Sequence, residues 1–288
     1  MATTTTRPAR AFLAGMSRPT KVACAILACF VLTAVVGPML RPFDSVTTRL
    51  GDRLLPPGAR LADGMFAPFG TDQLGRDLLA EVLAGSRISL LVALAVVVIG
   101  GLLGLVLGLV AGYFGGPPDA VISRLGDIQL AFPSILLAIL LAGVLGPGLA
   151  NIVIALAVTR WVVFARVVRA SAISVRNLDF VDSARLLGAG HLRIIWSYIL
   201  PSCWAPLFVA ATAQIGLTMV AEAALSFLGL GVPVSQASWG ATISEGRNYL
   251  GSAWWISTIP GTALAIVVIC VGIAGDALRN VADPQGRS

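Results

Sequence analysis

This sequence predicts an all-α integral membrane protein with six transmembrane helices. Its mean hydropathy is +0.90, and 57% of its 288 residues are hydrophobic whereas only 12% are charged. Several apolar runs approach the roughly 20 residues that a helix needs to cross the hydrocarbon of a bilayer. Because backbone groups in lipid must be bonded internally, unbroken apolar runs of this length predict helices.

The predicted spans follow one another along the chain. The first is long and lacks a convincing small-residue cleavage site, so we interpret it as an anchor and not as a cleaved signal. The second contains a ridge of glycines, the fourth an arginine and the fifth a polar stripe, whereas the third and sixth are defined by their apolar length. The six spans comprise residues 22–40, 88–111, 128–145, 149–170, 199–221 and 256–275.

Arginine and lysine near the spans predict the orientation of the chain, since they concentrate on the cytoplasmic side. The amino-terminal segment has basic residues and no acid, at Arg7, Arg10, Arg18 and Lys21. The connection between spans four and five is rich in arginine, at Arg166, Arg169, Arg176, Arg185 and Arg193, against Asp179 and Asp182. We therefore expect segments 1–21 and 276–288 in the cytoplasm, segments 41–87 and 225–255 outside, and a core of residues 88–275.

Several kinds of chemistry are excluded or disfavoured by the sequence. A Walker A phosphate loop needs a Gly-Lys pair, but the single lysine, Lys21, follows Thr20. The single histidine, His191, excludes a histidine metal cluster. The four cysteines lie in or beside apolar spans without metal-ligand spacing, at Cys24, Cys29, Cys203 and Cys270. We expect no catalytic residue, no cofactor and no metal site in this chain, and we attribute the net charge of +6 to topology and not to nucleic-acid binding.

The stretch DSARLLGAGHLRII, residues 182–195, interrupts this apolar chain with polar residues. Residues 179–187 can form about two helical turns, with Val181, Ala184 and Leu187 on one side. Gly188 or Gly190 can then adopt the left-handed conformation that ends a helix. Small residues at 183, 184 and 188 predict a ridge that fits the groove of a partner protein. The alternative is an ordinary amphipathic loop that rests on the lipid headgroups.

The longer stretch DFVDSARLLGAGHLRIIWSYILP, residues 179–201, resembles the EAA loop of binding-protein-dependent ABC importer permeases. Asp182, Ser183 and Ala184 stand where that family has Glu-Ala-Ala, so the first two depart from its pattern. Gly188 matches the glycine of the motif, and ILP at 199–201 matches its end. The resemblance implies a type I ABC importer permease fold whose cytoplasmic coupling helix docks on a separate ATPase, through Val181, Asp182, Ser183, Ala184, Leu187, Gly188 and Gly190.

Two outer stretches resemble the C-subunit type of dipeptide, oligopeptide and nickel permeases. They are FGTDQLGRDLLAEVLAGSRISL at 69–90 and EAALSFLGLGVPVSQASWGATISEG at 222–246, and GDALRNVADP at the carboxyl end resembles the same proteins. We expect the charges of the first stretch to pair with one another, the alternative being direct contact with substrate. We interpret Trp239, Trp254 and Trp255 as membrane-interface anchors. The first outer motif comprises Gly70, Thr71, Asp72, Gly75, Arg76 and Asp77.

Polar residues within the predicted spans are candidates for the translocation pathway or for contacts between helices. Arg160 lies half-way along span four, where an arginine is costly and should face protein or water; the alternative is a shifted span that lets it reach the interface. In span five, Gln214, Thr218 and Glu222 are spaced by four residues and form one polar stripe. The glycines of span two predict close helix packing, within this subunit or against a partner, at Gly100, Gly101, Gly104, Gly108 and Gly112.

The resemblance also implies the assembly. It implies a bacterial plasma (inner) membrane complex in which this chain is half of a permease heterodimer, with two cytoplasmic ATPase subunits that bind ATP and Mg and an extracellular substrate-binding protein. The expected cargo is a di- or oligopeptide. A nickel chelate or another small peptide-like solute is the alternative cargo, and a channel-like or scaffold membrane protein is a more distant alternative.

Overall fold

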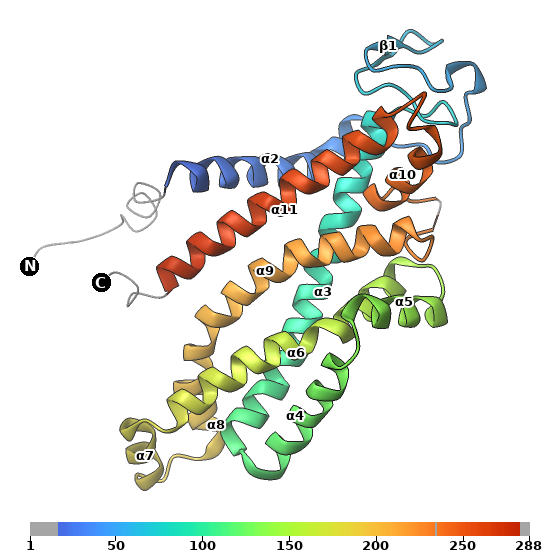
Figure 1. Cartoon of the computed structure of the whole chain (residues 1–288). Helices are drawn as coiled ribbons and strands as arrows, with labels where there is room; N and C mark the ends of the chain where they lie inside the picture. The colour runs from blue at the N-terminus through green and yellow to red at the C-terminus, as the bar shows by residue number, and fades with distance from the viewer. Residues whose placement is uncertain (1–16, 234, 283–288) are drawn as a thin grey trace, which may run out of the picture.

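The computed structural model describes residues 17–233 and 235–282, which are mainly helical (Figure 1). A small antiparallel hairpin, β1 (Ala59–Arg60) with β2 (Phe66–Ala67), lies near the start of the chain. The longer helices are α2 (Arg18–Leu40), α3 (Leu78–Phe114), α4 (Gly116–Leu130), α5 (Ser134–Leu145), α6 (Leu149–Arg176), α9 (Leu200–Phe227) and α11 (Trp255–Ala282). The shorter elements are η1 (Leu50–Asp52), α7 (Asp179–Leu186), α8 (His191–Ile194), the π-helical turn η2 (Ile195–Ile199), α10 (Trp239–Gly246) and η3 (Arg247–Tyr249).

Five helical runs among the described residues are long and apolar enough to cross a membrane. They are α2, α3, α6, the continuous run from His191 to Phe227, and α11. A sixth crossing exists if α4 and α5 together form one span. The predicted class, an all-helical membrane protein, is confirmed.

The predicted third span, 128–145, is not one straight helix. Its first residues end α4, its remainder forms α5, and the two helices meet at an angle of 89°. The break falls at residues 131–133, because Pro133 has no backbone N–H to donate and restricts the backbone of Phe132 before it. The apolar length was recognised in the sequence, but the effect of the proline was missed.

Most of the spanning helices extend beyond their predicted ends, and the extensions of α3 and α9 position the outer region. The helix α3 begins at Leu78, before the predicted start at 88, because the Asp77 side chain caps it by accepting hydrogen bonds from the backbone N–H groups of Leu79 and Ala80. The helix α9 continues to Phe227, beyond the predicted end at 221. Both extensions lie at the end of the bundle that carries the hairpin and α10 (Figure 1).

The glycine ridge of α3 packs within this chain, against α6. A Cβ atom added at Gly108 would lie 2.6 Å from the carbonyl oxygen of Ala165, and one added at Gly112 would lie 2.6 Å from the Cβ of Ala172. Any side chain at these positions would collide with α6. The glycines therefore bring the two helix backbones into direct contact, as small residues do in other membrane helix pairs.

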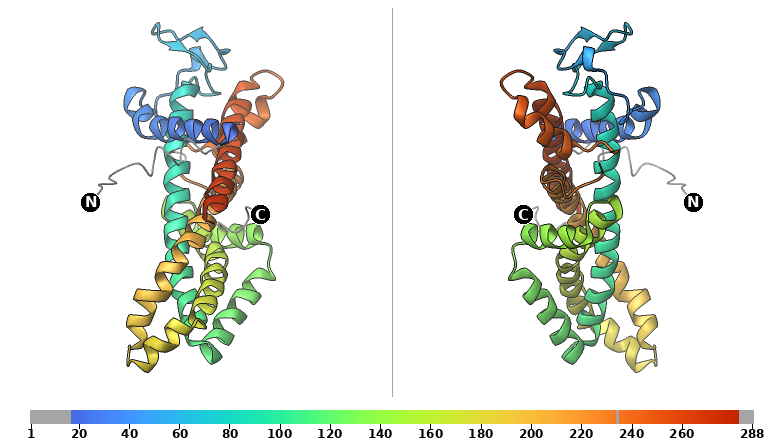
Figure 2. Two further views of the ribbon diagram at one scale, coloured as in Figure 1. Left: turned by 90° about the vertical axis from the view of Figure 1, so that its left-hand side faces the viewer. Right: turned by 90° about the vertical axis from the view of Figure 1, so that its right-hand side faces the viewer.

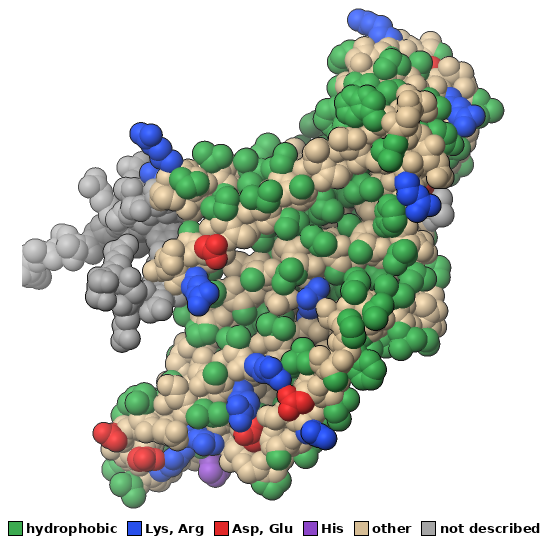
Figure 3. Space-filling view, in the orientation of Figure 1, with side chains coloured by type: hydrophobic (Ala, Val, Ile, Leu, Met, Phe, Trp, Pro, Cys, Tyr) green, Lys and Arg blue, Asp and Glu red, His purple; other side chains and the backbone are tan. Residues whose placement is uncertain are grey.

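The bundle has two polar ends. The hairpin and α10 lie at one end, and α7 lies at the other (Figure 1); Figure 2 shows the same separation from two further sides. In the space-filling view, apolar side chains cover the middle of the molecule, and many charged side chains gather toward the end that carries α7 (Figure 3). The candidate sites lie at these two ends and in the helix crossings between them.

Candidate functional site

The helix α7 is a short element at one end of the bundle. Asp179 and Asp182 lie in its first turn, where negative charge is favourable, and Arg185 lies in its last turn. Arg185 donates a hydrogen bond of 2.7 Å from its guanidinium to the Asp182 carboxylate. These contacts stabilise a helix of only eight residues.

Gly188 ends α7, as the sequence predicted. Its φ angle is +85°, in the left-handed region that favours glycine. The N–H of Gly188 donates to the carbonyl of Arg185 at 2.9 Å, and the N–H of Ala189 donates to the carbonyl of Ala184 at 3.0 Å. This is the paired hydrogen-bond pattern of a Schellman motif. Gly190, the alternative stop, has a φ of −68° and does not serve this purpose.

The predicted faces of α7 need two corrections. Val181 and Ala184 are buried within this chain, but Leu187 is 88% exposed and does not share their side. Leu187 is the C-cap residue, and the turn toward Gly188 directs the chain away from the helical periodicity. The small-residue ridge is also divided, because Ser183 and Gly188 are exposed whereas Ala184 is buried. The end of α7 instead exposes two adjacent leucines beside its polar residues, with Leu186 90% exposed next to Leu187.

A polar contact fixes α7 and α8 against the end of α3. The hydroxyl of Tyr113 and the Nδ1 atom of His191 are 2.7 Å apart and share a hydrogen bond. The Arg185 guanidinium lies 5.9 Å from the centre of the Tyr113 ring, within the range of a cation–π interaction. Arg176 donates to the carbonyl of Tyr113 at 3.1 Å. The role of Tyr113 could not be predicted from the sequence, since a lone tyrosine after an apolar span carries no signal of its partner.

The polar stripe of α9 is buried inside this chain. Gln214, Thr218 and Glu222 are all at most 5% exposed. Glu222 accepts hydrogen bonds from Ser89 on α3 at 2.9 Å and from Ser226 at 2.8 Å. Gln214 Oε1 and Thr218 Oγ1 have no hydrogen-bond partner among the described residues. The stripe therefore lies buried between the helices of this chain.

Arg160 lies at the crossing of α6 with α9. Its Nη2 atom donates to the carbonyl of Leu217 at 3.4 Å, and its Nε atom is buried without a partner among the described residues. Arg160 therefore contacts protein, one of the two environments that its sequence position predicted. The guanidinium is only partly satisfied by this chain.

The first outer motif forms a tightly connected turn before α3. Gly75 has a φ of +77°, and a Cβ atom there would collide with the carbonyl oxygen of Arg49. The Thr71 hydroxyl donates to the carbonyl of Asp52 at 2.6 Å. Asp77 forms an ion pair with Arg41 at 2.6 Å; burial raises the pKa of Asp77, and Arg41 partly offsets this effect. The motif therefore joins the end of α2 to the start of α3, and Gly70 shares its left-handed conformation at φ +77°.

Asp72 and Arg76 pair as the sequence predicted, inside the protein. The Arg76 Nε atom donates to Asp72 at 2.5 Å, and its Nη2 atom donates to Glu245 of α10 at 3.2 Å. Burial alone lowers the pKa of Arg76, but the carboxylates of Glu81, Asp72 and Glu245 outweigh burial and raise it. This pairing connects the first outer stretch to the second.

Two of the three outer tryptophans are not interface anchors. Trp239 is 2% exposed and donates from Nε1 to the carbonyl of Val82 at 2.9 Å. Trp255 is 6% exposed and donates to the carbonyl of Thr71 at 3.1 Å. Both indoles are buried because their N–H groups have backbone partners within the outer region. Trp254 is 53% exposed and remains a candidate anchor.

Comparison with known proteins decides the family. Residues 104–287 match the family described as "Binding-protein-dependent transport system inner membrane component". The chain belongs to this family. The EAA-like resemblance is thereby confirmed, and the chain is a membrane permease component, not the ATP-hydrolysing component, of such a transport system.

Relatives of this permease extend over nearly the whole chain. The di/tripeptide transport system permease protein DppC of Pseudomonas aeruginosa is 41% identical over 257 residues, which make up 88% of this chain and 84% of that protein. The nickel transport system permease protein NikC of Escherichia coli is 38% identical over 265 residues, covering 92% of this chain and 94% of NikC. Both belong to the subfamily that the outer motifs indicated.

Solved structures support the fold. A chain of the MetNI methionine ABC transporter, in an inward-facing conformation, matches with a TM-score of 0.58 at 20% identity. The match covers 70% of this permease and 96% of that chain. The permease therefore has the type I ABC importer fold.

Proposed function

We propose that this permease forms half of the translocation pathway of an ATP-driven importer of di- or oligopeptides. The observation that carries the proposal is the 41% identity to a di/tripeptide permease across 88% of the chain. That similarity includes both the outer motif and α7. A permease that serves peptides needs the first region to meet a substrate-binding protein and the second to meet an ATPase.

Coupling to ATP hydrolysis takes place at α7. Its inner residues, Val181 and Ala184, hold it to the bundle, and its outer leucines, 186 and 187, have no cover in the described chain. Two adjacent apolar side chains at a polar end of the molecule suit burial against another protein. Asp182 and Ser183 flank this surface, and Gly188 with Gly190 sets the return of the chain to α8.

The complex contains a second permease subunit, two cytoplasmic ATPase subunits and an extracellular substrate-binding protein. The ATPase subunits bind ATP and Mg, and this chain binds neither. The complex lies in the bacterial plasma membrane with α7 and both termini in the cytoplasm, since the basic residues of segments 1–21 and 166–193 favour that side. Of the predicted cytoplasmic segments 1–21 and 276–288, residues 1–16 and 283–288 lie outside the described residues.

Arg160 contributes to the wall of the pathway, whereas the stripe of α9 holds helices together. The buried Nε–H of Arg160 has no acceptor among the described residues, so its remaining hydrogen-bond partner comes from water, cargo or the second permease. Glu222, by contrast, is fully enclosed and bonded to Ser89 and Ser226. Gln214 and Thr218 continue the same buried line.

A nickel chelate is the second candidate cargo, because NikC is 38% identical across 94% of its length. The two cargoes are separated by reconstituting the complex with its partners in proteoliposomes and measuring ATP hydrolysis. We expect a peptide library to stimulate hydrolysis only when the substrate-binding protein is present. Stimulation by nickel complexes and none by peptides would contradict the peptide assignment. Hydrolysis that needs the permease but ignores every solute would contradict import itself.

A further inference from the structure

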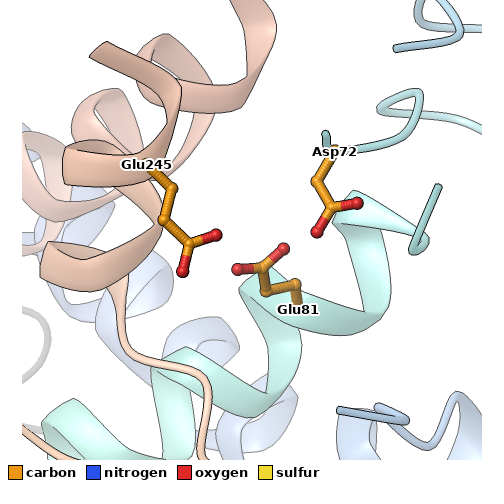
Figure 4. A group of neighbouring side chains, drawn as sticks. All are labelled: Asp72, Glu81 and Glu245. Atoms are coloured by element: carbon orange, nitrogen blue, oxygen red, sulfur yellow. The ribbon is translucent and has the colours of Figure 1, made fainter. Parts of the chain in front are cut away.

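The outer end of the permease contains a cluster of three carboxylates around Arg76. Asp72 comes from the outer turn, Glu81 from the first turns of α3 and Glu245 from α10, and one oxygen of each lies within 4.8 Å of the others. Figure 4 shows the Glu81 carboxylate directed into the space between the other two. We call these three residues and Arg76 the outer cluster.

Hydrogen bonding in the outer cluster is uneven. Asp72 accepts two backbone N–H groups on Oδ1 and the Arg76 guanidinium on Oδ2, so Oδ2 keeps room for a further partner. Glu245 accepts from Arg76 and from the amide nitrogen of Gln73. Glu81 is only 3% exposed, and its Oε1 accepts from Thr242 at 2.6 Å. Its Oε2 has no donor among the described residues, which is costly for a buried carboxylate.

A second oxygen beside the cluster also lacks a donor. The Gln73 amide nitrogen donates a hydrogen bond to Glu245, and the buried Oε1 of Gln73 has no partner among the described residues. Both unsatisfied atoms are acceptors, so the missing group is a donor or a cation. A cavity of about 200 Å³ adjoins Glu81 and is lined by Glu81, Glu245 and Arg76 together with three serines. This volume holds an ion and several waters, since a water takes about 30 Å³ in the liquid.

The charge of the outer cluster favours a cation over a neutral donor such as water. Three carboxylates face one guanidinium in the outer cluster, which leaves two negative charges in a largely buried site when all three are ionised. One divalent cation neutralises both. Oxygen donors of this kind suit hard cations such as Ca²⁺, Mg²⁺ or Mn²⁺ better than nickel. Ca²⁺ binds oxygens at about 2.3–2.6 Å, so two oxygens on opposite sides of the ion are roughly 5 Å apart. The carboxylate oxygens of this cluster lie within 4.8 Å of one another, which fits that spacing.

We propose that the outer cluster binds a Ca²⁺ ion through Glu81, Glu245, Asp72 and the side-chain oxygen of Gln73. The ion joins the start of α3 to α10 and so fixes the outer loops relative to the bundle. The site lies at the end opposite α7. In the proposed orientation this end faces outward, so the site meets extracellular Ca²⁺. The proposal depends on that orientation for its source of calcium, but it is independent of the cargo.

Terbium luminescence tests the site directly in the purified transporter complex. Tb³⁺ replaces Ca²⁺ and is excited through nearby tryptophans, and Trp255 and Trp239 donate hydrogen bonds to the carbonyls of Thr71 and Val82, next to Asp72 and Glu81. We expect a saturable Tb³⁺ signal that Ca²⁺ displaces. Glu81→Gln should weaken binding about tenfold or more, since even residues that only support a metal ligand contribute about 10–100-fold to affinity.

Two further variants keep the test decisive. Asp63→Asn removes an exposed outer carboxylate that pairs with Arg49 away from the cluster, and it should leave Tb³⁺ binding unchanged. Gln73→Leu keeps all three carboxylates and should still weaken binding, which answers the case in which Glu81→Gln fails to fold. Absence of a saturable signal, or equal signals in all variants, would overturn the proposal. A melting temperature that changes with pH but not with added Ca²⁺ or chelator would also overturn the proposal. That result would mean that a proton, and not a metal ion, neutralises the Glu81 carboxylate.

Discussion

Gly108 shows, at the scale of single residues, how two long membrane helices are held together without large side chains. Its Cα hydrogen faces the carbonyl of Ala165, and there is no room for a Cβ atom. Within lipid, helices gain little from burying apolar side chains, so contact between backbones matters more than it does in water. The close packing of α3 against α6 therefore requires that these positions carry a hydrogen atom in place of a side chain.

The substitution Gly108→Ala should destabilise the purified complex by about 1–3 kcal/mol, the usual cost of overfilling a packed contact. Gly272→Ala is the matched control, because a Cβ atom at Gly272 meets nothing within 4 Å. There, alanine should be neutral or stabilise the helix by up to about 1 kcal/mol. Thermal melting of both variants checks the pair, and equal shifts would contradict the packing account.

Placing Arg160 within a membrane span costs free energy, so we expect the residue to have a function that offsets this cost. An arginine at the centre of a span costs about 2.5–3.5 kcal/mol on insertion scales, and among the described residues Arg160 bonds only to the carbonyl of Leu217. We expect Arg160→Met to leave the amount and melting temperature of the complex unchanged or higher while peptide uptake falls. Arg166→Met, which removes an exposed pair with Asp127, is the control. Normal uptake by Arg160→Met would show that the arginine has no role in the pathway.

Individual helices differ in how far the sequence predicted them. The apolar runs were sufficient for α2, α3, α6, α9 and α11, because length and hydropathy alone define a span. They were insufficient for α4 and α5, where the bend depends on Pro133 and on how the two helices pack. For α7, the glycine stop and the buried pair Val181 and Ala184 followed from local pattern. The exposure of Leu187 did not, since it depends on the turn that Gly188 makes.

Gly188 and Gly190 offer a matched pair that tests the geometry of α7. A Cβ atom at either position meets nothing within 4 Å, but φ is +85° at Gly188 and −68° at Gly190. An L-residue in the left-handed region costs roughly 1–2 kcal/mol. We expect Gly188→Ala to loosen α7 and reduce stimulated ATP hydrolysis, and Gly190→Ala to have little effect. Faster hydrogen exchange of α7 in the first variant only would identify the cause; equal behaviour would contradict it.

The whole molecule places its two polar regions at opposite ends of one helical bundle. The turn before α3 meets α10 at one end through Arg76 and Glu245, and α8 meets α3 at the other through His191 and Tyr113. Neither connection was predictable from the sequence, because each joins residues that are distant along the chain and lack a shared local pattern. The motifs indicated which regions matter, and the fold shows what each region contacts.

Orientation in the membrane is tested by cysteine labelling in a variant without the four native cysteines. Ser183→Cys, on the exposed part of α7, should react only after the membrane is made permeable, and Ala62→Cys, near the hairpin, should react in intact cells. The excess of arginine on the α7 side is the physical reason. The reverse labelling pattern would place both termini outside and contradict the proposed topology.

The coupling of this permease to an ATPase is tested most directly by charging the outer surface of α7. The double substitution Leu186→Glu with Leu187→Glu alters side chains that are 90% and 88% exposed, so the fold of the chain should be retained. The matched control is Val46→Glu with Leu50→Glu, two exposed apolar residues of the outer segment. We predict that the α7 variant inserts and pairs with the second permease but loses the ATPase subunits on purification, while the control retains them. If the α7 variant instead purifies with its ATPases and transports normally, α7 is not the coupling element.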